Sequence, residues 1–198
     1  MFRFTRSFVL VLLASGALIV QGKVLLQSHG SHGAKPSTPQ AQAAPSGKLK
    51  VVGQVSVNGA SAISGATVFS DSTITTAARS SAVVSLGKLG RVEVLPESTM
   101  KLSFTDSSIA VSMLEAGRVR VSSSVGIGAT ATTNDGEVVA TGPQQNWFTV
   151  DTSCGNTWVS VSKGRVELRA GGTVKQIAAG SQDSAGTARP GCMPGGGR

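Results

Sequence analysis

Residues that could carry out chemistry are few in this sequence, and their positions argue against a catalytic site. Both histidines, His29 and His32, fall in the segment Ser-His-Gly-Ser-His-Gly, where no large apolar residue is present to hold them. A Ser–His–Asp or Cys–His arrangement needs a histidine that the fold keeps in place. The two histidines could form a weak copper or nickel ligand pair, but a solvated linker is the default interpretation. We therefore expect no metal site and no cofactor.

Carboxylates offer a second route to catalysis. Eight of them fall in expected turns or on the polar faces of expected strands: Glu93, Glu97, Asp106, Glu115, Asp135, Glu137, Asp151 and Glu167. Nothing in their spacing brings two of them together, as acid–base catalysis by paired carboxylates would require. The segment Gly126-Ile127-Gly128 lacks the lysine and the helix start of a phosphate-binding loop. The sequence predicts a protein that is not an enzyme.

The N-terminus has the layout of a secretory signal peptide. Arg3 and Arg6 precede an uncharged run over residues 8–20, and the polar Gln21-Gly22-Lys23 follows. This pattern predicts a signal peptide over residues 1–22 and a periplasmic or secreted protein. The alternative is an uncleaved anchor in the inner membrane formed by residues 8–26. The apolar run has 13 residues, and a spanning helix needs about 20, which favours cleavage.

The two cysteines are predicted to form a disulfide, because paired cysteines in an exported chain form bonds in an oxidising compartment. Cys154 lies in an expected turn, and Cys192 lies in the C-terminal tail, 38 residues later. A loop of that length gives a chain-entropy stabilisation of about 3–4 kcal/mol. Such a bond would pin the tail across the domain. Two free thiols are the alternative.

Composition divides the chain of 198 residues into four expected parts. The signal peptide or short anchor over residues 1–22 is followed by a Pro/Ser/Ala/Gly linker over residues 23–48. This linker buries too little apolar surface to offset its ordering entropy. Residues 49–182 form the folded domain, and residues 183–198 form a Gly/Pro-rich tail.

Apolar residues alternate with polar ones throughout residues 49–182. Val92 and Val94 alternate with Arg91 and Glu93, for example, and the pattern recurs in short runs rich in Val, Thr and Ser. Turn signals separate these runs: Asn58-Gly59, Asn134-Asp135-Gly136, Gly155-Asn156 and Gly171-Gly172. A period of two residues between turns is typical of half-buried strands. The expected fold is all-β, with about a dozen short strands.

A short motif that begins with glycine occurs three times in the sequence, and we call it the internal echo. It favours some β-architectures over others. The segment Gly90-Arg91-Val92-Glu93-Val94 recurs as Gly117-Arg118-Val119-Arg120-Val121 and as Gly164-Arg165-Val166-Glu167-Leu168. A glycine that turns the chain before a strand suits each coil of a wound β-structure. Glycine followed by a strand also occurs by chance in a Val-rich β protein. A distorted β-roll or short β-solenoid is the favoured architecture, and a β-sandwich is the alternative.

Several of these segments, taken in order, resemble the FecR-like domain, a β-rich periplasmic module. They are Ile63-Ser64-Gly65-Ala66-Thr67-Val68, Gly90-Arg91-Val92-Glu93-Val94-Leu95-Pro96-Glu97-Ser98, Leu114-Glu115-Ala116-Gly117-Arg118-Val119-Arg120-Val121 and Val159-Ser160-Val161-Ser162-Lys163-Gly164-Arg165-Val166-Glu167-Leu168. The resemblance covers about Val52 to Gly180. Its motifs consist mainly of glycine, valine and threonine, so their specificity is moderate.

The resemblance implies a non-catalytic extracytoplasmic module that receives signals through protein contacts in the cell envelope. The best-known members of the family regulate a sigma factor through a cytoplasmic segment of several dozen residues. Only seven residues precede the apolar run here, so direct handling of a sigma factor is not expected. The expected partner is an envelope protein, which would dock on a sheet edge or an exposed aromatic residue. A structural or glycan-associated envelope protein is the alternative.

Charge and aromatic residues complete the expectations about partners. The formal net charge is +8, but the lysines and arginines are scattered, which does not suit a nucleic-acid-binding surface. Scattered positive charge would favour a weak attraction of the protein to anionic cell-wall polysaccharide. Trp158 is out of phase with Val159 and Val161, which predicts an outward-facing ring and a contact for a partner or a glycan. Cover for a sheet face is the alternative.

Overall fold

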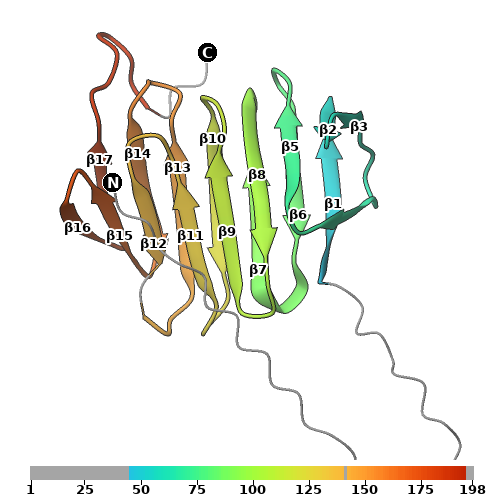
Figure 1. Cartoon of the computed structure of the whole chain (residues 1–198), viewed down its shortest axis with the longest axis horizontal. Helices are drawn as coiled ribbons and strands as arrows, with labels where there is room; N and C mark the ends of the chain where they lie inside the picture. The colour runs from blue at the N-terminus through green and yellow to red at the C-terminus, as the bar shows by residue number, and fades with distance from the viewer. Residues whose placement is uncertain (1–44, 141, 195–198) are drawn as a thin grey trace, which may run out of the picture. The chain divides into compact units, whose positions relative to one another are not determined.

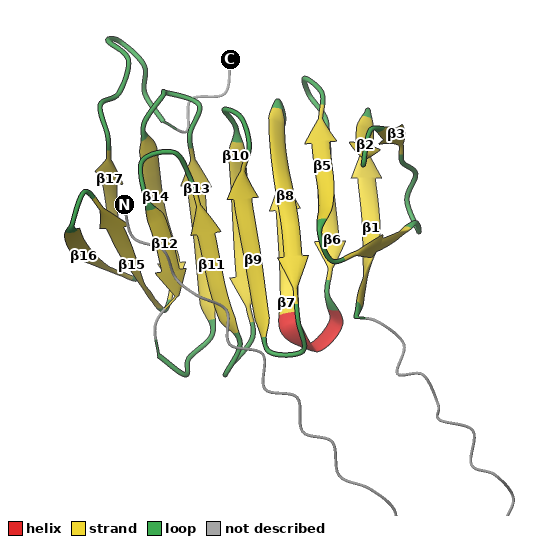
Figure 2. Ribbon diagram, viewed as in Figure 1, coloured by secondary structure: helices red, strands yellow, loops and turns green. Residues whose placement is uncertain are grey.

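The computed structural model describes residues 45–140 and 142–194. The expected signal peptide, the histidine pair and the linker up to residue 44 lie outside the described residues. In the described part of the chain, no helical segment has the length and apolar character that crossing a bilayer requires. Strands dominate this part, and a short 3₁₀ turn at Gly87–Leu89 interrupts them (Figure 2).

The alternation of apolar and polar residues in the sequence corresponds to an alternation of buried and more exposed side chains in the structure. The strand β8 (Ser98–Phe104) has every second side chain buried, and β9 (Ser108–Met113) and β10 (Arg118–Ser123) show the same pattern. Because successive side chains of a strand point to opposite faces, each of these strands covers a core with one face only. The largest fully buried side chains include Phe148, Ile74, Met100 and Leu102.

The strands form two sheets, which we name sheet A and sheet B. Sheet A has eight strands in the order β17 (Gln182–Ala185), β14 (Thr157–Lys163), β13 (Asn146–Asp151), β10, β7 (Gly90–Val94), β6 (Ser81–Ser85), β1 (Ser46–Val52) and β4 (Thr67–Phe69). Sheet B has nine strands in the order β16 (Thr173–Ala178), β15 (Arg165–Ala170), β12 (Glu137–Ala140), β11 (Gly128–Thr132), β9, β8, β5 (Ser72–Thr76), β2 (Val55–Val57) and β3 (Ala60–Ser61). The inner faces of the two sheets enclose the core.

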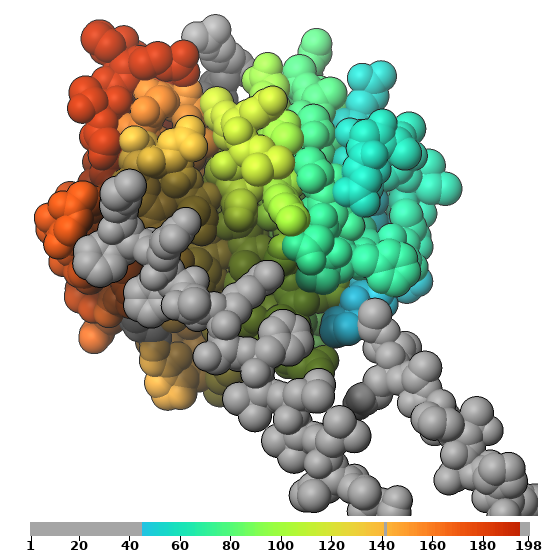
Figure 3. All heavy atoms as spheres, in the orientation of Figure 1, coloured from blue at the N-terminus to red at the C-terminus, as the bar shows by residue number. Residues whose placement is uncertain are grey.

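The chain winds steadily from one end of the two sheets to the other. It places one or two strands in one sheet, crosses to the other sheet and continues. From β5 onward, strand order therefore follows sequence order in both sheets, while β4 lies outside β1 and β3 lies outside β2 at the first end (Figure 1). The colour bands of Figure 3 accordingly lie side by side, from blue-green at one end to red at the other. Between β9 and β11, which pair in parallel, the chain crosses once through β10 and completes a full coil.

The all-β class is confirmed. The two facing sheets match the β-sandwich alternative, while the winding path is that of a roll. The described residues contain 17 strands rather than about a dozen, because several strands of two to four residues, such as β3 and β4, are too short to show an alternation. The first strand begins at Ser46 rather than Leu49, and β17 extends to Ala185.

The structure gives a steric reason for the glycines that begin the echoed segments. A side chain at Gly90 would collide with the backbone carbonyl of Ser122, and one at Gly117 would lie 2.6 Å from the Cα atom of Ser98. Gly90 begins β7 and Gly117 precedes β10, and these two strands pair directly. These two glycines therefore mark points of close approach, to the paired strand β10 at Gly90 and to Ser98 of the other sheet at Gly117.

Candidate functional site

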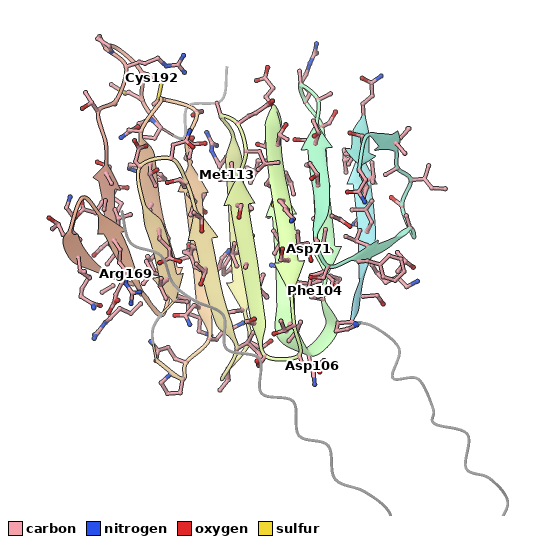
Figure 4. All side chains as sticks on the ribbon, viewed as in Figure 1. Asp71, Phe104, Asp106, Met113, Arg169 and Cys192 are labelled. Carbon is pink, nitrogen blue, oxygen red and sulfur yellow. A yellow bond between two sulfur atoms is a disulfide. The ribbon has the colours of Figure 1, made fainter. Side chains whose placement is uncertain are left out.

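The predicted disulfide is confirmed: Cys154 and Cys192 are bonded, with their Cα atoms 5.6 Å apart. The tail is also held by hydrogen bonds, since the Arg189 amide donates to the Cys154 carbonyl at 2.9 Å and its guanidinium donates to the Ser153 carbonyl. Figure 4 shows Cys192 at the end of the domain opposite Asp106. Because disulfides form and persist in oxidising compartments, the bond indicates an oxidising environment for this domain.

Trp158 lies on the outer face of sheet A, as its phase predicted. It is half-buried on β14, between the buried residues Thr157 and Val159. Trp147 lies on the same face of the neighbouring strand β13 and is also half-buried, while Phe148 points into the core. The register pairs Asp151 with Trp158, and Trp147 is four residues from Asp151 along β13. The two indoles are thus separated by about 13 Å along the strands.

Two arginines of β10 complete this surface. Arg118 pairs with Asp151 in the ladder, and its Nε donates to Asp151 Oδ2 at 2.8 Å. Arg120 lies opposite Glu93 of β7, and its Nη1 donates to Glu93 Oε2 at 2.7 Å. Each guanidinium is oriented by a carboxylate and keeps further N–H donors with no partner among the described residues.

Together these residues line a shallow hollow of about 480 Å³. Between the indoles and the arginines, the hollow is lined by the hydroxyl groups of Thr149, Ser160 and Ser162. We call this surface the indole face and define it as Arg118, Arg120, Trp147, Thr149, Trp158, Ser160 and Ser162. Its volume is within the range of small-ligand sites, and its chemistry is aromatic, cationic and hydroxyl-bearing.

Trp147 is the more enclosed of the two indoles. The guanidinium carbon of Arg91 lies 5.7 Å from the centre of its ring, within the range of a cation–π contact. Its ring nitrogen is buried and has no hydrogen-bond partner among the described residues. The polar edge of Trp147 is therefore directed away from solvent, which leaves Trp158 as the indole better placed to meet a ligand.

A second surface is the edge of sheet B formed by β16. The register pairs Ala170 with Thr173 across the two-residue turn Gly171-Gly172. In such a hairpin the closing pair exchanges hydrogen bonds, so alternate residues of the second strand direct their N–H and C=O groups outward. On β16 these are Val174, Gln176 and Ala178. The other edge strands, β3, β4 and β17, have two, three and four residues, against six for β16.

Charged side chains tie β16 to its surroundings. Lys175 Nζ donates to Asp183 Oδ1 at 2.8 Å and to the Ser184 carbonyl, which joins the edges of the two sheets. Two hydrogen bonds lower the pKa of Asp183 below its ordinary value. The one from Lys175 has the larger effect, and the one from the Ser184 amide has the smaller effect. Hydrogen bonds from Arg169 and then from Gln176 lower the pKa of Glu167 in the same way.

Four of the eight carboxylates considered for catalysis accept hydrogen bonds from side chains of the fold. Glu93, Asp151 and Glu167 each bind an arginine within 3.0 Å, and Asp135 accepts a hydrogen bond from Thr157 at 3.1 Å. Among residues 45–140 and 142–194, no three His, Cys, Asp or Glu side chains are grouped so that they could hold a metal ion. His29 and His32 lie outside the described residues.

Sequence reasoning located the disulfide and Trp158 but missed the arginine pair and the β16 edge. Arg118 and Arg120 did alternate with Val119 and Val121, which placed them on the outer face. Their neighbours on β13 and β14 depend on a ladder between segments about 30 residues apart, which periodicity does not reveal. The turn signal Gly171-Gly172 marked a hairpin, but nothing local identified its second strand as an edge.

No protein-family model matches this sequence, and no curated protein matches it. Two crystal structures of a candidate anti-sigma factor from Parabacteroides distasonis, at 1.65 and 2.50 Å resolution, are similar in fold. Each is 20% identical to this chain, with a TM-score of 0.48 over 62% of this chain and 57% of the other. The match thus spans little more than half of that protein. Similarity at this level assigns no function, so the resemblance to FecR-like domains stays a prediction.

Proposed function

We propose that this protein is a non-catalytic, extracytoplasmic FecR-like module that binds or senses through protein contacts in the cell envelope and acts in signal transduction. The observation that carries the proposal is the long edge of sheet B at β16. Its outward N–H and C=O groups can accept a further strand from a partner. Figure 1 shows β16 at the outer end of the sheet, next to β15.

Natural proteins usually protect an exposed edge with short strands, proline, bulges or free charges. β16 lacks proline, pairs with β15 without a register shift, and extends over six residues. Its single lysine, Lys175, is bound to Asp183 and Ser184 rather than projecting from the edge as a free charge. Val174 on the outer face is 56% exposed. These properties favour β16 as a strand-accepting edge.

The oxidising environment that the disulfide indicates supports export of the mature domain to the periplasm or its secretion. An anchor formed by residues 8–26 is the alternative. N-terminal sequencing of protein from fractionated cells separates the two: a mature chain starting near Lys23 supports cleavage, and Met1 retained in the membrane fraction contradicts it.

The docking proposal is tested by photo-crosslinking in the native envelope. A photoreactive residue at Val174 should give an adduct with one defined protein, whereas the same residue at Val125, 72% exposed in the loop between β10 and β11, should not. Gln176→Pro removes an outward N–H and should abolish the adduct, while Gln176→Ala keeps the N–H and should preserve it. Equal adducts at both sites, or an adduct that survives Gln176→Pro in a folded protein, would contradict the proposal.

A second candidate is a glycan-associated envelope protein. The indole face favours it, because half-buried indoles beside hydroxyl and guanidinium groups are suited to sugar rings as well as to proteins. This surface belongs to sheet A, whereas β16 belongs to sheet B. The two candidates can therefore be tested with separate variants.

A further inference from the structure

The indole face combines aromatic and hydroxyl groups, and this combination limits the classes of ligand that it could bind. Trp158 offers an aromatic surface, and Thr149, Ser160 and Ser162 add hydroxyl groups beside it. An indole packs against the apolar face of a sugar ring, while hydroxyl groups can donate to and accept from the ring substituents. The separation of the two indoles, about 13 Å along the strands, is wider than one sugar ring.

The charges on this face favour an acidic ligand over a neutral one. The two carboxylates on its border, Asp151 and Glu93, are already bound to Arg118 and Arg120. The arginine side chains stay 24% and 36% exposed. A guanidinium has five N–H donors and binds carboxylates in a fork geometry. Each arginine is therefore held in position by one carboxylate and can still receive a second.

Further cations lie beside the indole face or elsewhere on sheet A. Lys48 and Lys50 are exposed on β1, which belongs to the same sheet and is the third strand from β10. Arg91 covers Trp147. Arg189 is held by the disulfide-linked tail at Ser153, the residue whose amide and hydroxyl donate to Asp151. The outer face of sheet A therefore carries an excess of positive charge, from Arg91 and Arg189 beside the indole face and from the two lysines of β1.

We propose that the indole face binds an acidic polysaccharide. Sugar rings stack on Trp158, and carboxylates of the chain meet the remaining N–H donors of Arg118 and Arg120. This inference deepens the glycan-associated candidate function and does not depend on the β16 edge. An extended polymer can follow this face from Trp147 to Trp158, since both indoles line the same shallow hollow.

Binding of the full chain to three polymers tests the ligand class: polygalacturonate, which is acidic and made of sugars, dextran, which is neutral, and poly-L-glutamate, which is acidic without sugars. We expect binding to polygalacturonate that weakens as salt rises, because the ionic contacts are screened. Dextran and poly-L-glutamate should bind at least tenfold more weakly. Equal binding of poly-L-glutamate would show that charge alone acts and would overturn the proposal. Equal binding of dextran would overturn the acidic specificity and leave the glycan-associated candidate standing.

Variants test the location of the site. Trp158→Ala should weaken polygalacturonate binding by about tenfold or more, as expected for a central aromatic contact, and Trp158→Phe should restore part of it. The matched control is Phe69→Ala, since Phe69 is an aromatic residue 57% exposed on β4 at the far edge of the same sheet. Arg120→Gln should reduce the preference for polygalacturonate over dextran. Wild-type binding by Trp158→Ala, equal losses with Phe69→Ala, or no binding to any polymer would each refute the site.

Discussion

Arg118 and Asp151 form an ion pair at the end of the β10–β13 ladder in sheet A, with Nε and Oδ2 2.8 Å apart and the Asp151 side chain fully buried. The amide and the hydroxyl of Ser153 also donate to Asp151 Oδ1, at 2.9 and 2.5 Å. The pair joins β10 to β13 directly beside Trp158. It links the packing of the sheet to the geometry of the indole face.

Removing the arginine should cost more stability than neutralising the carboxylate. Arg118→Met leaves a buried carboxylate without its cation, and we expect a loss of about 2–3 kcal/mol in the free energy of unfolding, less than for a fully enclosed pair because Arg118 is partly exposed. Asp151→Asn leaves the partly exposed arginine solvated, so a loss of about 1–2 kcal/mol is expected. Urea unfolding of both variants measures the difference. A smaller loss for Arg118→Met than for Asp151→Asn would contradict this ranking.

Loss of the disulfide should destabilise the whole domain rather than the tail alone. The loop between Cys154 and Cys192 encloses β14, β15, β16 and β17, so opening it frees strands of both sheets in the unfolded chain. The double variant Cys154→Ser/Cys192→Ser should lose about 3–4 kcal/mol in unfolding free energy. Denaturant unfolding of oxidised and reduced wild type provides the second measurement. A tail that becomes protease-sensitive without any change in the unfolding midpoint would contradict the expectation.

The echoed glycine of β7 should tolerate no side chain. Gly90 has φ 130°, and a Cβ atom there meets the Ser122 carbonyl of the paired strand β10. Gly90→Ala should therefore lower stability by about 2–4 kcal/mol through backbone displacement and strain. The matched control is Gly59→Ala, where φ is 79° but no atom lies within 4 Å of the added Cβ. That change should cost about 1–2 kcal/mol. Thermal unfolding of the two variants compares them, and equal costs would show that close approach is not the reason for the echo.

The contact between Lys175 and Asp183 predicts a pH dependence at the end of the two sheets. Because the pKa of Asp183 is lowered on folding, its contribution to stability is complete above its ordinary pKa of 3.8 and disappears as the pH falls through the lowered value. Lys175→Met should raise the pKa of Asp183 towards 3.8, whereas Lys163→Met, whose lysine binds Gln145, should leave it unchanged. Carboxyl NMR titration measures both. An unchanged Asp183 pKa in Lys175→Met would contradict the assigned cause.

Local sequence patterns were sufficient to predict much of the fold but less of the candidate site. Alternation around Val92, Val119 and Val166 predicted strands with one buried face, because inward and outward positions follow from a period of two residues alone. The pairing of Arg118 with Asp151 could not be predicted in this way, since it depends on which strands become neighbours after the chain has crossed between sheets. Trp158 was predicted to face outward from its phase, but its arginine and hydroxyl neighbours come from other strands.

The winding path has a consequence for how the domain can come apart and how its length can change. Since strand order follows sequence order from β5 to β17 in both sheets, each of these strands packs mainly against strands that are close to it in the chain, as in a stack of repeats. Such a stack can unravel from its ends without disturbing its middle. The disulfide closes the end that contains β14 to β17, so fraying should begin at the opposite end, among β1 to β5. For the same reason, a hairpin could be gained or lost at an end without rebuilding the core.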